Sequence, residues 1–119
     1  MKFAADVLKL VDKLPKTPSG YAVAKQLARS GTGVGANYRA VRTSRSRAEF
    51  IAKLGVVVEE ADESTFWLDL VVKTDLAEAR VVQPLRREAC ELLAIFSRSL
   101  GTARFNQRVA LARGGQMAT

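Results

Sequence analysis

The stretch that decides the fold spans residues 49–72 and reads EFIAKLGVVVEEADESTFWLDLVV. Its seam positions recur at alternating steps of four and three residues: Phe50, Leu54, Val57, Ala61, Ser64, Leu68 and Val71. A repeat of 3.5 residues is typical of helices packed side by side in left-handed bundles. Ser46 and Glu49 form a capping-box pattern at the start of the stretch. We therefore expect a long helix here that ends near residues 74–76.

Helical spacing continues on both sides of this stretch. Apolar side chains recur every three or four residues from Phe3 to Leu14, and again within a second segment of about residues 20–43. A fourth apolar pattern follows Pro84, which suits the first position of a helix, and runs to about Leu100 or beyond Gly101. No alternating β pattern competes with these helices.

Four helices with short joints predict an all-α fold, an antiparallel up-down four-helix bundle. The chain has 119 residues, which suits one domain with one core. We expect the bundle to occupy residues 1–112 and to be followed by a frayed C-terminal tail at 113–119. No apolar run approaches the roughly 20 residues that cross a membrane. The lone Cys90 excludes an internal disulfide and fits a cytoplasmic protein.

Three glycines in the interior of the second helix need a reason, since each costs about 1 kcal/mol relative to alanine. The segment Gly31–Ala36, which reads GTGVGA, matches the loose G-x-G-x-x-A pattern of dinucleotide-binding proteins. That pattern binds pyrophosphate only in a turn between a strand and a helix, and no strand precedes these residues. We expect close packing of a neighbouring helix and no cofactor.

The chain has no histidine, which excludes a serine or cysteine nucleophile paired with imidazole and the two-histidine zinc motifs. Glu59 and Glu63 share one helix face, but no second carboxylate cluster accompanies them, as a metal site would need. A salt-bridged or solvated acidic face is favoured over a metal site. The sequence therefore favours a protein that is not an enzyme.

The net charge of +7 is divided along the chain. Residues 1–48 include 10 basic and 2 acidic side chains, residues 49–78 include 2 basic and 8 acidic, and residues 79–119 include 7 basic and 2 acidic. Two explanations fit this segmentation. The basic segments bind a polyanion, or they pair with the acidic helix within or between subunits.

The densest basic cluster is the candidate nucleic-acid-binding site, and it lies next to Tyr38: Arg39, Arg42, Arg45 and Arg47, with Arg29 further back on the same helix. Arginines beside an aromatic ring can bind phosphates and stack on bases. The C-terminal arginines are weaker candidates. The alternative is a scaffold in which charge serves assembly. Its candidate oligomer interface lies on the acidic helix: Glu59, Glu63, Phe66 and Trp67.

The sequence also resembles a known family in two blocks. The first is Gln26–Tyr38, which reads QLARSGTGVGANY. The second is made of short matches at Ser44–Ser46, Phe50–Lys53, Glu59–Ser64 and Trp67–Leu68. Over residues 3–100 the chain resembles the bacterial four-helix-bundle family, also called the 23S ribosomal RNA intervening-sequence protein family.

This resemblance implies an up-down bundle that assembles into a homopentameric ring. It also implies similarity to the accessory variability determinant of diversity-generating retroelements, a basic pentamer whose partners are a reverse transcriptase and nucleic acid. The partners so implied are further copies of the chain, RNA or DNA, and such a protein partner. The chain departs from the family at Gly33, usually serine, and at Ala40-Val41, often Glu-Ala, so roles of those side chains do not carry over.

Overall fold

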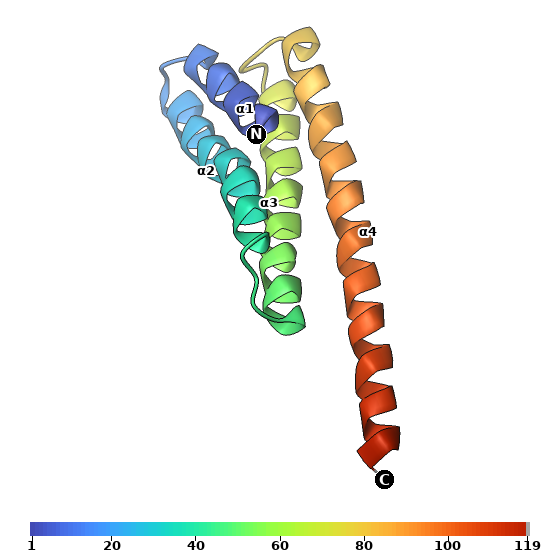
Figure 1. Cartoon of the computed structure of the whole chain (residues 1–119). Coiled ribbons are helices and arrows are strands. Elements are labelled where there is room, and N and C mark those ends of the chain that lie inside the picture. The colour runs from blue at the N-terminus through green and yellow to red at the C-terminus, as the bar shows by residue number, and fades with distance from the viewer. Residues whose placement is uncertain (119) are drawn as a thin grey trace.

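The structure is a computed structural model that describes residues 1–118, with side chains described as far as Gly114. Every element in this part of the chain is a helix, and the order is α1 Lys2–Lys13, α2 Pro18–Val41, α3 Arg47–Lys73 and α4 Ala79–Ala118. Successive helices run in opposite directions, as Figure 1 shows. The predicted all-α, up-down four-helix bundle is therefore confirmed.

Helix α3 lies at the centre of the arrangement, because α2 packs along one side of it and α4 along another. Helix α1 packs on α2 and also contacts α4, while α2 and α4 do not meet along their backbones. The predicted seam of α3 forms the middle of the core, with every position from Leu54 to Val71 buried and Phe50 half-buried. Phe3 and Val7 of α1 and Leu27 of α2 pack into the same core.

Local signals fix where α2 and α3 begin. The Thr17 hydroxyl accepts a hydrogen bond of 3.1 Å from the backbone N–H of Gly20, which caps α2. The Ser46 hydroxyl accepts one of 3.0 Å from the N–H of Glu49, and the Glu49 carboxylate accepts one from the N–H of Arg45. The predicted cap by Ser46 is therefore present, while Glu49 reaches back to the residue before the cap rather than to the N–H of Ser46.

Small residues let the helices approach one another. A Cβ at Gly31 would lie 2.6 Å from Cγ1 of Val7, so glycine at this position allows α1 to lie against α2. On the other side of α2, the fully buried hydroxyls of Ser30 and Ser64 form a 3.0 Å hydrogen bond to α3. The expectation that the glycines serve close helix packing is confirmed at Gly31.

Helix α4 differs from its predicted limits. It begins at Ala79, so Pro84 lies inside the helix rather than at its first position. Pro84 is close enough to the N-terminal end for its missing N–H to cost only one early hydrogen bond. The helix continues past Gly101 to Ala118, while the frayed tail at 113–119 stays a prediction, with Thr119 outside the described residues. Leu100 is still buried in the core and Asn106 still contacts Arg47 of α3, whereas Phe105 and Leu111 are exposed.

Unequal helix lengths shape the molecule. Helix α1 has 12 residues and α2 has 24, so α1 covers only part of α2, and the N-terminal end of α1 lies beside Gly35, which faces Met1 and Ala4. Beyond that level only α2, α3 and α4 remain, and α4 continues alone past the start of α3 (Figure 1). The molecule is 64 Å long and about 22 Å wide. One end is therefore an incomplete bundle.

We predict that Gly31→Ala lowers the free energy of unfolding by about 1–3 kcal/mol, because the new methyl group overlaps Val7. Gly55→Ala on α3 is the matched control, since nothing lies within 4 Å of its added Cβ. This control should raise stability by about 1 kcal/mol through helix propensity. Urea unfolding measures both values, and equal effects of the two substitutions would contradict the packing role of Gly31.

Candidate nucleic-acid interface

Two basic segments that are far apart in the sequence meet at the incomplete end of the bundle. The chain has no acidic residue between Asp12 and Glu49, or after Glu91. The antiparallel course of α4 brings the second of these acid-free segments beside the end of the first. The guanidinium Nη1 of Arg47 donates a hydrogen bond of 3.1 Å to the backbone oxygen of Asn106, 59 residues away.

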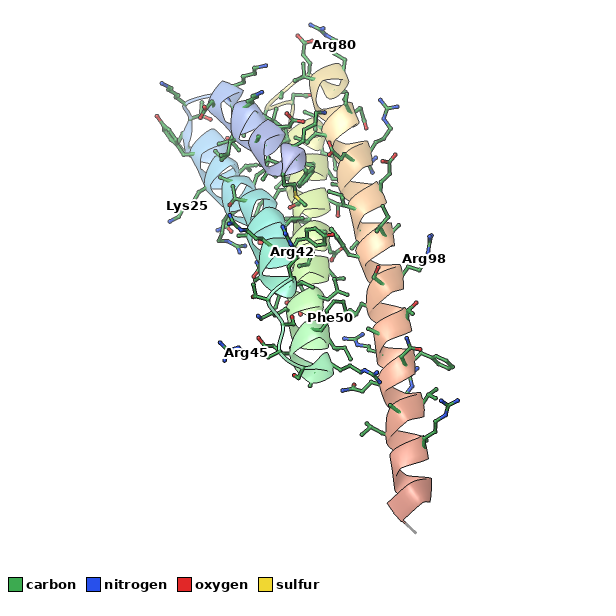
Figure 2. All side chains as sticks on the ribbon, in the orientation of Figure 1. Lys25, Arg42, Arg45, Phe50, Arg80 and Arg98 are labelled. Carbon is green, nitrogen blue, oxygen red and sulfur yellow. The ribbon has the colours of Figure 1, made fainter. Side chains whose placement is uncertain are left out.

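We call this region the basic end and define it by its arginines: Arg39, Arg42, Arg45, Arg47, Arg98, Arg104 and Arg108. In Figure 2 Arg45 lies beside the α2–α3 connection, Arg42 and Arg98 lie nearer the middle of the molecule, and Arg80 lies at the opposite end from Arg45. Within residues 1–114, none of the seven arginines forms a salt bridge. Their charges are therefore available to an anionic partner.

Glu49 is the acidic residue nearest to these arginines along the chain, and a lysine already pairs with it. Lys53 Nζ lies 2.7 Å from the Glu49 carboxylate and also donates to the backbone oxygen of Ala40. The hydrogen bond from Lys53 and a second from the N–H of Arg45 lower the pKa of Glu49. Glu49 is thus held as a carboxylate where α2 and α3 meet. Lys53 offsets its charge, so Glu49 does not neutralise the arginines of the basic end.

A groove opens at the basic end where α1 no longer covers the gap between α2 and α4. It has a volume of about 690 Å³. Its apolar lining comes from three helices and includes Val41, Phe50, Leu54, Ile95 and Phe96, while Arg42, Arg45 and the serines of the α2–α3 connection supply its polar part. A mixed lining of this size is typical of a binding site for a small organic group.

Tyr38 stands at one edge of this groove. Its ring lies 5.2 Å from the ring of Phe96, centroid to centroid, so the two aromatic side chains bridge α2 and α4. A second hollow of about 680 Å³ lies on the α1 side and shares Tyr38 and Arg42 with the groove. Tyr38 keeps 43% of its surface exposed, although it lies four residues after the buried Val34 and three before the buried Val41.

Arg29 does not belong to the basic end. Its guanidinium pairs with the carboxylates of Glu63 and Glu60 on α3, the latter at 3.6 Å. The Glu63 carboxylate also accepts a 3.3 Å hydrogen bond from the indole N–H of Trp67. The structure therefore places Arg29 and Glu63, which the sequence assigned to different sites, in one ion-pair cluster within a single chain.

Glu60 in this cluster is only partly satisfied. Burial raises the pKa of its carboxyl, an effect that the charge of Arg29 partly offsets. Its Oε2 atom is buried and has no hydrogen-bond donor among the described residues. A Cβ at Gly33 would lie 3.1 Å from this oxygen. Position 33, which is usually serine in the family that the sequence resembles, thus faces the unpaired Oε2 atom of Glu60.

The remaining candidates of the acidic helix lie on or beside its outer face. Phe66 has 56% of its surface exposed, and its ring packs edge-on against that of Trp67 at 4.8 Å. Trp67 is half-buried against the core. Glu59 is exposed, as is Val56 one turn before it. Cys90 is also exposed.

Among the described residues, no three histidine, cysteine, aspartate or glutamate side chains gather as metal ligands. None of the helices in this part of the chain has a segment that is long and apolar enough to cross a membrane. The sequence missed the groove, and it gave Arg98, Arg104 and Arg108 only as weaker candidates among the C-terminal arginines. The absence of acidic residues after Glu91 was the signal for a second basic segment. The position of that segment relative to the start of α3 depends on helix register.

Comparisons with known proteins agree with the fold. A model of the 23S rRNA-intervening sequence proteins matches residues 1–98. A crystal structure of a protein of unknown function from the S23 ribosomal protein family of Bacteroides thetaiotaomicron has a TM-score of 0.77 and 29% identity, over 83% of this chain and 92% of that one. No curated protein matches.

The chain is thus a four-helix-bundle protein with a basic, incomplete end. It belongs to the 23S rRNA-intervening sequence protein family. The matched region ends at residue 98, so Arg104 and Arg108 lie beyond it.

We predict that Gly33→Ser lowers the pKa of Glu60, because the new hydroxyl can donate to the unpaired Oε2 atom and stabilise the charged form. The variant should be about 1 kcal/mol more stable than Gly33→Ala at neutral pH, and NMR titration of the Glu60 carboxyl measures the pKa.

The extra stability of Gly33→Ser over Gly33→Ala should shrink as the pH falls through the folded pKa of Glu60, since the protonated carboxyl no longer needs the serine hydroxyl as a donor. Urea unfolding at neutral pH and at about pH 4 provides the comparison. An unchanged Glu60 pKa in Gly33→Ser would contradict the assignment of this contact.

Proposed function

We propose that this protein is not an enzyme and binds nucleic acid, RNA above all, through phosphate contacts made by the basic end. The observation that carries the proposal is the meeting of two acid-free basic segments, held together by the hydrogen bond from Arg47 to Asn106. Arg39, Arg42 and Arg45 are its central residues. Arg29 has a minor role, because Glu60 and Glu63 already offset its charge.

The chemistry of arginine supports this function. Guanidinium groups bind phosphate oxygens in a bidentate way and remain charged at any physiological pH. Free cations grouped at one end of an elongated molecule create a local positive field that attracts a polyanion. The resemblance to the accessory determinant of diversity-generating retroelements supports the same class of partner.

We predict that the triple substitution Arg39→Gln, Arg42→Gln and Arg45→Gln weakens binding to RNA by at least about tenfold at low salt. With three fewer phosphate contacts, the slope of log affinity against log salt should fall by roughly 2 for a single strand. Fluorescence anisotropy with labelled RNA over a salt series measures both quantities.

The matched control changes three exposed cations outside the basic end: Lys9→Gln, Lys25→Gln and Arg87→Gln. It removes the same net charge, so it should retain most of the affinity and most of the salt slope. Equal losses in the two triple variants would mean that net charge alone drives binding. Absence of binding to any RNA or DNA at low salt would refute the proposed function.

A second function, assembly into a scaffold, is favoured by the outer face of α3. Val56 and Phe66 are exposed there, with 38% and 56% of their surfaces free, next to the acidic Glu59. Exposed apolar side chains of this size can mark a surface on which another protein packs. We propose that copies of the chain pack on this face, and the family resemblance indicates a homopentamer.

Charge matching between copies would then depend on Glu59 rather than on Glu63, which Arg29 of the same chain already pairs. Trp67 would contribute through Phe66, whose ring it supports. Both proposed functions can operate together, because the outer face of α3 and the groove involve different residues.

We predict a native mass of five times the 13.0 kDa of the chain. Val56→Glu combined with Phe66→Glu should reduce the mass to that of one chain, because it places charges in an apolar contact. Tyr21→Glu, at an exposed position of α2, is the control and should remain assembled. A monomeric wild-type protein at micromolar concentration would contradict this second proposal.

A further inference from the structure

We propose that the groove at the basic end is a subsite for an unpaired nucleobase, which stacks on Tyr38 while Arg42 and Arg45 hold the flanking phosphates. The inference rests on the proposed nucleic-acid binding and adds a chemical preference to it. The protein would then select single-stranded segments over duplexes, without reading a base sequence.

The geometry offers an aromatic surface where the backbone of a strand would be held. Tyr38 projects between two hollows of similar volume, about 690 and 680 Å³, and both of them include Arg42 in their lining. Phe96 supports the Tyr38 ring from α4, so the ring is fixed in place while 43% of the residue stays exposed. A fixed ring loses little conformational freedom when a base stacks on it.

The charges around the groove fit a phosphate-bearing ligand. Its lining includes two arginines and no acidic residue, and neither arginine forms a salt bridge among the described residues. The floor, formed by Phe50, Leu54 and Ile95, would cover the flat face of a base. Duplex RNA cannot use such a floor, because its bases are stacked on one another.

A second copy of the chain is the main competing occupant. The unpartnered part of α4 has exposed apolar side chains, Phe105 and Leu111, that could fill an apolar groove. That segment also bears Arg104 and Arg108 and no acidic residue, so it would bring further positive charge against Arg42 and Arg45. Like charges at an interface disfavour that contact, and a phosphate-bearing strand is favoured.

The test compares labelled oligouridylate of about ten nucleotides with an abasic strand of the same length and charge. We expect wild-type protein to bind the strand with bases about tenfold more tightly, the effect of roughly one stacked base. Tyr38→Leu should abolish this difference and leave affinity for the abasic strand unchanged. Tyr38→Phe should keep the difference, since it keeps the ring.

Tyr21→Leu is the matched control, because Tyr21 is an exposed tyrosine of the same helix outside the groove. It should behave as wild type. Arg42→Gln with Arg45→Gln should weaken binding of both strands by a similar factor. Circular dichroism checks that each variant keeps its helices.

The outcomes separate the subsite from the proposed function. Equal binding of the two strands by wild-type protein would overturn the subsite and leave phosphate binding standing. Absence of binding to either strand would remove both. Dissociation of a native assembly by Ile95→Glu would show that a second copy fills the groove and would likewise overturn the subsite.

Discussion

The difference in length between α1 and the other helices is the constraint on which the rest of the structure depends. Helix α3 needs apolar partners along its whole seam, and α2 and α4 supply them on two sides. Helix α1 completes the bundle only as far as Gly35 of α2, which the side chain of Met1 faces. Beyond that point the fourth position is empty. Apolar surface that a full bundle would bury there is left to line a groove.

The same length difference decides where the charge gathers. The incomplete end is where α2 passes into α3 and where α4 extends past them, and both segments lack acidic residues. Apart from Glu49, which Lys53 pairs, the acidic residues of α3 lie further along the helix, where Arg29 pairs with Glu60 and Glu63. Positive charge is therefore balanced in the body of the bundle and unbalanced at its end. Charges that served only to keep the protein soluble would not need to gather at one end without acidic partners. This separation therefore indicates an anion-binding surface.

The sequence predicted the four helices, the core seam from Leu54 to Val71 and the capping residue Ser46 well, because these features depend on residues close in sequence. Periodicity could not predict that Tyr38 would be exposed, because its exposure depends on how far along α2 the N-terminal end of α1 reaches. Nor could it bring Asn106 of α4 against Arg47 at the start of α3, since the register of antiparallel helices is set by packing. The pairing of Arg29 with Glu63 was missed for the same reason: the sequence shows opposite charges but not which of them meet.

Mapping of the contacts between protein and RNA tests the central claim most directly. Ultraviolet crosslinking to labelled single-stranded RNA, followed by mass spectrometry of the attached peptides, reports which segments touch the strand. The account predicts crosslinks in two separate segments, residues 38–50 and residues 95–108, in the same complex. Crosslinks confined to the first half of α2, to α1 or to the acidic middle of α3 would contradict it.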